Sequence, residues 1–328
     1  MKQYLDIPSL IKSNFYKKNK RLFWHVVHDE YKIISDEVHN LFKSFQLDEL
    51  ENEIFQITQE DIYNELTRYL THILDFKIIS KKNYEPIYST ESKIYINPIW
   101  QKMPIQNTFQ LALNKQRNQY SKIRFFYSKL VEKIPKNYFK YIIASENILL
   151  KEFKANKKLK FLKILTNYHF SENYEKNSFS QNLSKKISNK IISIINEKYF
   201  NLSFDQKESI NFILEINFTR AYNNIKDYTG FFKKTENLVL GTSNNYDGRL
   251  ASFLANKNGS KIWKFNHGGE RCFFNDQIYW SNLFYNTDVF VSYGQEWKKY
   301  TSRIIDNFRT NSISIGSKYH KKLYENYF

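Results

Sequence analysis

The glycines of this chain are confined to its last third, which restricts the fold more than any other feature. All eight lie after residue 229, and most punctuate residues 236–294. Three short apolar runs in this window each end in a small or polar turn: Leu238–Leu240, Ile262–Phe265 and Val289–Val291. Short buried strands that alternate with helices are typical of a parallel sheet in an α/β domain.

The turns after these runs are where a site is expected. A stretch with apolar residues at i, i+3 and i+4 separates the first two runs and predicts a helix over Arg249–Asn256. In parallel sheets the loops that leave the carboxyl ends of the strands line the ligand site. The turns carrying Asp247, His267 and Gly294 should therefore share one edge.

The rest of the chain reads as helices with a few strands. Periodicity predicts helices over 33–45, 62–76, 108–131, 182–197, 296–308 and from an N-cap at Ser203 through 222. Strands are predicted at 21–28, 138–144 and 312–315, with a helix and a strand around 159–165. Residues 84–104 read as a loop with a short strand, and the acidic run 48–60 as a solvated helix surface.

These elements predict an α/β fold, a Rossmann-like parallel sheet with added helices. Residues 1–20 are interpreted as a basic, loosely held lead-in. Residues 21–316 are expected to form one helix-rich domain, whose glycine-punctuated α/β part begins at 230, and 317–328 to begin a linker. Glycine is absent before residue 230 and proline after residue 135, which separates the helix-rich part from the α/β part.

The formal net charge of +17 is the one extreme of the composition. A basic balance favours polyanionic partners: nucleic acid, an anionic membrane surface or phosphorylated substrates. The lysines are spread along the chain, and no nucleic-acid-binding motif occurs, so nucleic acid is the less favoured partner. The lysine clusters at 17–21, 151–160 and 185–190 are interpreted as solvated faces.

The single cysteine, Cys272, excludes a disulfide framework and indicates a reducing compartment. No stretch approaches the ~18 apolar residues of a membrane-spanning helix, and the first residues lack the apolar run of a signal peptide. The expected location is cytoplasmic, with the inner face of the cell membrane as a peripheral site.

His267 is the leading candidate for chemistry. It follows a predicted strand and precedes Gly268 and Gly269, which let backbone and ligand approach closely. An imidazole at a strand end suits a general base or a phosphate ligand, although a histidine satisfied within its turn is the alternative. Asp247 is either a second catalytic carboxylate, as nucleophile or base, or a structural residue at the start of a helix, as its N-cap or in its first turn.

Further polar residues are expected beside these two. Ser243 and Asn244 precede Asp247 and suit a phosphate or sugar hydroxyl. Glu146 follows the strand at 138–144 and is a catalytic candidate if that strand is central, with a solvent-facing Glu as the alternative. Glu270 and Arg271 extend the glycine turn. Arg271 and Arg249 match phosphate geometry, with surface charges as the alternative. No histidine spacing indicates a metal site, so no metal is expected.

Two motifs carry a resemblance to a known family. A strand ending in Phe265–Gly269 (FNHGG) is followed some twenty residues later by Thr287–Gly294 (TDVFVSYG), and then by Ile315–Ser317 (IGS). This pattern resembles bacterial surface-carbohydrate transferases of the GT-B type. These include CDP-glycerol glycerophosphotransferases, leptospiral-type surface carbohydrate transferases and Kdo transferases. The resemblance covers about eighty residues.

The resemblance implies the acceptor-side, N-terminal half of a GT-B glycosyltransferase (an EC 2.4-type enzyme), with most of the second Rossmann-like domain missing. It implies sugar transfer from a nucleotide-activated donor, CMP- or CDP-linked, to a surface glycan or lipid-linked acceptor. The donor is a co-substrate, and no further cofactor is expected. His267 would take the place of the family's cleft histidine. The alternatives are a nucleic-acid-binding protein and an inert half-enzyme that acts as a binding scaffold.

Overall fold

A computed structural model describes residues 3–6, 28–81, 84–89, 94–96, 141–145, 147–156, 161–163, 170, 174–233, 235–241, 245–266, 284, 286–295 and 310–316. The chain divides into two compact units. The first comprises Met1–Asn52, Asp61–Arg117 and Lys176–Thr219. The second comprises Glu53–Glu60, Asn118–Glu175 and Arg220–Phe328. The sequence predicts one domain over 21–316 instead.

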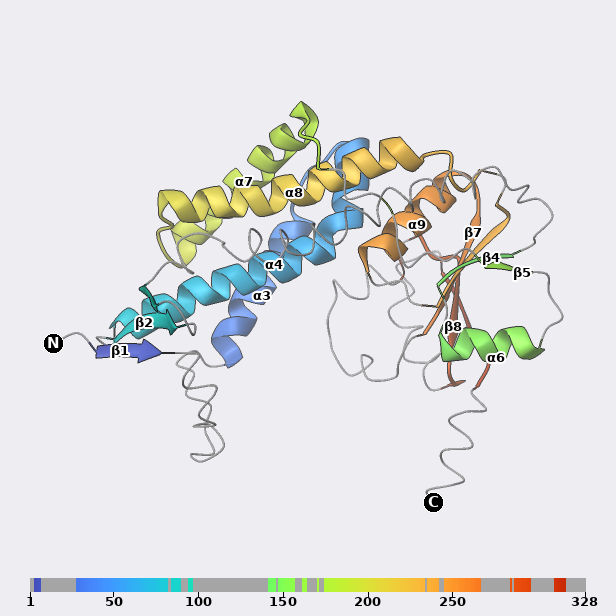
Figure 1. Cartoon of the computed structure of the whole chain (residues 1–328), viewed down its shortest axis with the longest axis horizontal. Coiled ribbons are helices and arrows are strands. Elements are labelled where there is room, and N and C mark those ends of the chain that lie inside the picture. The colour runs from blue at the N-terminus through green and yellow to red at the C-terminus, as the bar shows by residue number, and fades with distance from the viewer. Residues whose placement is uncertain are drawn as a thin grey trace, which may run out of the picture. The chain divides into compact units, whose positions relative to one another are not determined.

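The first unit is built on parts of four helices: α3 (His28–Lys43), α4 (Glu49–Lys81), α7 (Ser178–Lys198) and α8 (Phe204–Tyr228) (Figure 1). Their apolar residues recur at helical spacing and are buried, as in Ile187, Ile191 and Ile195 of α7. The helix predicted after Ser203 is confirmed, and Ser203 and Gln206 form a capping box at its start. A small sheet in the order β1–β2–β3 completes the description: β1 (Gln3–Asp6), β2 (Tyr84–Ser89) and β3 (Ile94–Ile96).

The interpretation of residues 48–60 as a solvated surface is wrong. Asp48 and Glu51 form a capping box at the start of α4, each accepting the other's backbone N–H. Ile54 and Ile57 are buried at 0% and 1% exposure. The acidic residues of this run therefore flank a buried apolar face, which local charge density does not reveal.

The second unit is built on a six-stranded sheet in the order β5–β4–β6–β7–β8–β9, in which all neighbours are parallel. Its strands are β4 (Tyr141–Ser145), β5 (Phe161–Lys163), β6 (Asn237–Leu240), β7 (Lys261–Phe265), β8 (Val289–Ser292) and β9 (Asn311–Ser314). This arrangement confirms the predicted α/β fold with a parallel sheet. The three apolar runs of the glycine-punctuated window are its strands β6, β7 and β8.

Successive side chains along each strand point to opposite faces of the sheet, and both faces are buried. One face packs against α6 (Ile148–Asn156), where Leu149 and Phe153 meet Ile143, Val239 and Phe265. The phenyl rings of Phe153 and Phe265 lie edge to face, 5.3 Å apart. The opposite face carries the alternate residues of these strands, and α9 (Tyr246–Lys257) contacts β4, β6 and β7 (Figure 1). Burial on both faces explains why the strands read as continuous apolar runs.

Candidate functional site at the carboxyl edge of the sheet

The strand order changes direction between β4 and β6. From β4 the chain moves outward to β5, and it then returns to the other side of β4 to continue through β6, β7, β8 and β9. At such a switch point the loops leaving two neighbouring strands diverge to opposite faces, and ligands of open α/β sheets bind outside the carboxyl ends there. The carboxyl edge at β4 and β6 is therefore the candidate site.

The Asn147 side chain forms hydrogen bonds with backbone groups of several elements at this edge. Its Nδ2 lies 2.5 Å from the carbonyl oxygen of Gly241, 2.9 Å from that of Asn266 and 3.3 Å from that of Phe265. Its Oδ1 accepts the backbone N–H of Leu150 at 2.9 Å and so caps α6. One side chain, only 8% exposed, thus ties the start of α6 to the ends of β6 and β7.

These hydrogen bonds hold in place the residues at which two loops of the predicted site begin. Gly241 directly precedes residues 242–244, and Asn266 directly precedes His267. The Gly241 N–H also donates to the Ser145 carbonyl at 2.8 Å, and the Asn266 N–H to that of Val291 at 2.9 Å. Gly241 and Asn266, at which the two loops begin, are therefore both hydrogen-bonded to neighbouring strands.

A polar cluster lies where the β6–α9 turn enters α9. Arg220 of α8 lies over the Tyr246 ring, with its Cζ 3.8 Å from the ring centroid. Asn224, which is fully buried, donates its amide to the Tyr246 hydroxyl at 3.0 Å and fixes that ring. Arg220 Nη2 lies 3.8 Å from Asp247 Oδ1, and the two side chains are 21% and 25% exposed. An acidic and a basic side chain are thus both partly exposed at this edge, although Asp247 Oδ1 and Arg220 Nε are themselves buried.

The structure places Asp247 at the start of α9. The N-cap is Asn245, whose side chain accepts the Gly248 N–H at 2.9 Å, so Asp247 is not the cap. Asp247 lies in the first turn, as its structural interpretation expects, where a negative charge is stabilised by the helix dipole. Its carboxylate remains a candidate for chemistry at the edge.

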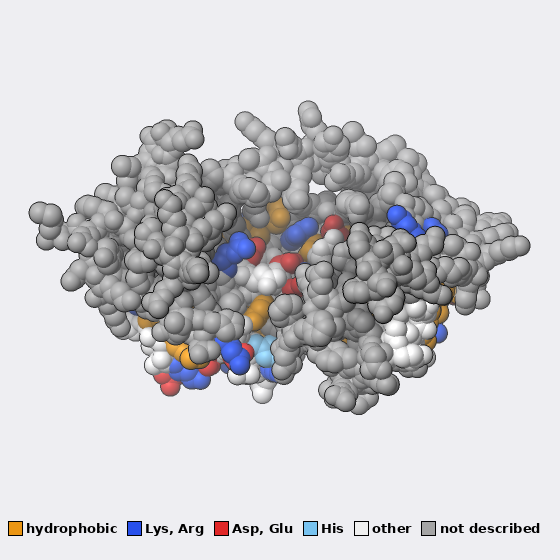
Figure 2. Space-filling view, turned by 90° about the horizontal axis from the view of Figure 1, so that it is seen from below, with side chains coloured by type: hydrophobic (Ala, Val, Ile, Leu, Met, Phe, Trp, Pro, Cys, Tyr) orange, Lys and Arg blue, Asp and Glu red, His pale blue; other side chains and the backbone are white. Residues whose placement is uncertain are grey.

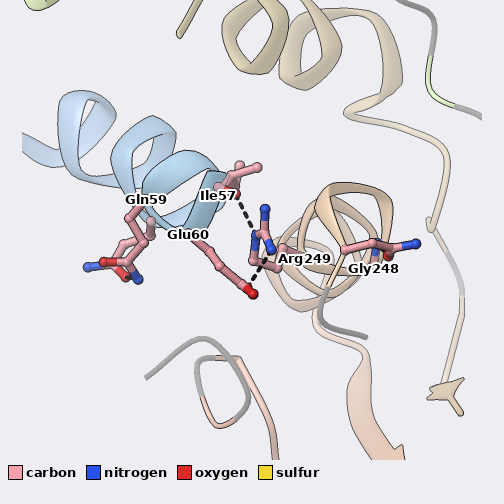
Figure 3. Close-up of polar contacts among 7 residues, drawn as sticks. Ile57, Gln59, Glu60, Gly248 and Arg249 are labelled. Carbon is pink, nitrogen blue, oxygen red and sulfur yellow. Dashed lines mark hydrogen bonds and ion pairs between the residues drawn. The ribbon is translucent and has the colours of Figure 1, made fainter. Parts of the chain in front are cut away.

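The Arg249 side chain points toward α4, where it meets Ile57 and Glu60 (Figure 3). Its Nε donates to the Ile57 carbonyl and its Nη1 to Glu60 Oε2, both at 2.7 Å. The Arg249 side chain is 4% exposed and that of Glu60 14%. The alternative of a surface charge is therefore wrong, and these contacts favour an anchoring role for Arg249 over phosphate binding.

A second pair shows how α9 lies along the α4 segment. Lys257, at the end of α9, binds Glu53 at 2.9 Å, near the start of the segment. Arg249, near the start of α9, binds Glu60 at the end of the segment. The two helices are therefore antiparallel. The two basic residues are eight positions apart on α9 and their acidic partners are seven positions apart on α4, and both separations correspond to about two helical turns.

The structure describes three of the predicted site residues: Asp247, Arg249 and Gly294. Gly294 follows β8 at the carboxyl edge, and a Cβ added to it would meet no atom within 4 Å, so packing does not demand glycine there. The other predicted site residues lie outside the described part of the chain: Glu146, Ser243, Asn244, His267, Gly268, Gly269, Glu270 and Arg271.

Asp288, in the TDVFVSYG motif, has a structural role at the other end of the sheet. It directly precedes β8, and its Oδ2 accepts the backbone N–H of Ile262 at 2.8 Å. It therefore bridges the beginnings of β7 and β8. The motif's carboxylate lies at the amino edge, whereas its tyrosine and glycine follow β8 at the carboxyl edge.

Tyr293 leaves the carboxyl end of β8 and packs partly against the α6 face of the sheet. Burial raises the pKa of its phenol, and the charge of Glu152 on α6 raises this pKa further. The Tyr293 hydroxyl therefore stays protonated at neutral pH, where it can donate a hydrogen bond.

Sequence reasoning missed Asn147, Arg220, Tyr246 and Lys264. Asn147 carries a local signal, because an Asn directly after a strand and before an apolar helix is an N-cap candidate. Lys264 is a lysine inside an apolar strand run. Arg220 carries no local signal, since it lies within a long helix and meets Asp247 only in the folded chain.

Several described basic residues lie beside acidic ones. On the face in Figure 2, some Lys and Arg side chains are visible next to Asp or Glu side chains. In the first unit Lys186 pairs with Glu51 and Lys198 with Glu37, although each lysine side chain is about half exposed. The positive charge of these lysines is thus partly offset locally.

Three further findings bear on partners. Of the helices that the structure describes, none is both long and apolar enough to cross a membrane. Within the described ranges, no three His, Cys, Asp or Glu side chains are grouped so that they could hold a metal ion. No protein-family model, curated protein or solved structure matches this chain.

Proposed function

We propose that this protein is a glycosyltransferase that moves a sugar from a nucleotide-activated donor to a surface glycan or lipid-linked acceptor. The observation that carries the proposal is the switch point between β4 and β6, where Asn147 fixes the roots of two loops. One loop continues into Ser243 and Asn244, and the other into His267. The resemblance of the FNHGG and TDVFVSYG motifs to GT-B transferases supplies the reaction class.

The residues take the following roles in this proposal. His267 acts as base or donor-phosphate ligand, and Asp247 acts as nucleophile or base. Arg271 and the amides of the glycine turn stabilise the negative charge of the leaving phosphate. Arg220 takes the place at the edge that the sequence assigned to Arg249, because its side chain is 21% exposed whereas that of Arg249 is 4% exposed and paired with Glu60.

The experiment is thermal unfolding with CMP-, CDP-, UDP- and GDP-linked sugars, with duplex DNA in parallel. A donor at a hundredfold excess over its Kd should add about 2.7 kcal/mol to the free energy of unfolding. A rise in Tm with one nucleotide class that is lost in His267→Ala supports the proposal. A rise with DNA alone, falling steeply with salt, would refute it in favour of a nucleic-acid-binding protein.

Arg220→Gln is expected to weaken donor binding about tenfold or more, because a charge-assisted contact to phosphate contributes roughly 1.5–3 kcal/mol. Isothermal titration calorimetry with the donor identified above measures the change. Lys226→Gln is the matched control, since Lys226 is an exposed cation six residues further along α8. Equal affinities of the two variants would remove Arg220 from the site.

A further inference from the structure

Lys264 is buried in the middle of the sheet. It lies on β7 and is 1% exposed. Its neighbours in register are Leu240 on β6 and Phe290 on β8, which provide no charge. A lysine ammonium in such surroundings loses most of its hydration, which disfavours its charged form.

Lys264 lies on the face of the sheet that α9 covers, because the alternate β7 residues Trp263 and Phe265 belong to the cluster on the α6 face. The charges of Arg249 and Glu60 both act on it there. Arg249 lies on α9, and Glu60 lies on the α4 segment, and these two are paired with each other at 2.7 Å. Burial and, to a smaller extent, the charge of Arg249 lower the pKa of Lys264, the charge of Glu60 opposes them, and the resulting pKa is about 7. When Lys264 is protonated, two buried cations share one carboxylate.

We propose that Lys264 is a buried proton switch that sets how firmly α9 is anchored to residues 53–60 of α4. Neutral Lys264 does not compete with Arg249 for Glu60. Protonated Lys264 repels Arg249 and competes with it for Glu60, so the anchor weakens. Arg249 lies two residues after Asp247, and the switch therefore acts on the first turn of α9. Control of catalysis by this switch rests on the proposed function, whereas the switch itself does not.

The direction of the pH dependence follows from the two pKa values of Lys264. In the unfolded chain this pKa is 10.5 and in the folded protein it is about 7. Between these values the unfolded or opened state binds more protons, so stability rises with pH. Below the folded pKa both states are protonated, and the penalty of burying the charged lysine is then complete.

The test is hydrogen exchange of the α9 amides, followed by mass spectrometry between pH 6.5 and 8.5 and corrected for intrinsic exchange rates. In the wild-type protein, protection of α9 should rise about tenfold over this range. Lys264→Met should show high protection without this rise, because a thioether neither binds a proton nor repels Arg249. Lys264→Arg should show low protection without the rise, because the guanidinium keeps its charge.

Lys261→Met is the matched control, since Lys261 is an exposed lysine on the same strand, and it should behave as the wild type does. The proposal is overturned if wild type and Lys264→Met show the same slope, or if protection changes equally in α6 and α9. A protein that binds no donor but passes this test retains the switch and loses the glycosyltransferase proposal. If the protein binds a donor but α9 protection in wild type and Lys264→Met depends on pH in the same way, the glycosyltransferase proposal is retained and the switch is refuted.

Discussion

Glu60→Gln is expected to lower the free energy of unfolding by about 3 to 5 kcal/mol, as is typical when one partner of a buried ion pair is removed. The Arg249 guanidinium would remain almost fully buried after losing the Glu60 carboxylate, while it keeps the Ile57 carbonyl and gains a neutral amide in place of the charge. Urea unfolding followed by circular dichroism measures the loss.

Glu53→Gln is the matched control for this prediction. Glu53 pairs with Lys257 between the same two helices, but the Lys257 side chain is 49% exposed. The control should therefore cost less than about 1 kcal/mol. A double variant, Arg249→Met with Glu60→Leu, should be more stable than Glu60→Gln, since it leaves no buried charge unpaired. Equal losses in Glu60→Gln and Glu53→Gln would show that the burial of the Arg249 pair has no energetic consequence.

Asn147→Ala is expected to lower the free energy of unfolding by about 2 to 4 kcal/mol. It removes the cap of α6, which contributes about 1 kcal/mol, and it takes a buried donor from the Gly241 and Asn266 carbonyls, which costs a further 1 to 3 kcal/mol. Urea unfolding measures this loss. The same variant should weaken donor binding, because the roots of both candidate loops lose their shared tie.

Asn245→Ala separates the two contributions of Asn147. Asn245 caps α9 through the Gly248 N–H, and its loss should cost only about 1 kcal/mol. Any further loss of unfolding free energy in Asn147→Ala measures the contribution of its hydrogen bonds to the Gly241 and Asn266 carbonyls. If the two variants are equally destabilised, Asn147 acts as a helix cap and has no role at the switch point.

Most of the second unit's sheet was predictable from residue order. The runs at 238–240, 262–265 and 289–291 became β6, β7 and β8, because strands buried on both faces are apolar throughout. Helix α9 was predicted over 249–256 but begins three residues earlier, since Asn245 and not Asp247 is its cap. The division into two units was not predicted, because α4 and α8 contribute residues to both.

The local sequence pattern was thus sufficient to predict the class of fold and the edge of the sheet at which a site is expected. Buried strands appear in the sequence as apolar runs, and the turns between them are marked by glycines. Tertiary structure alone decided what the charges do. Arg249 and Glu60 are 189 positions apart, and Asn147 and Asn266 are 119 apart, so no local window contains either pair. A polar side chain takes its role from the partners and the burial that folding brings to it, and neither is encoded in its neighbours in sequence.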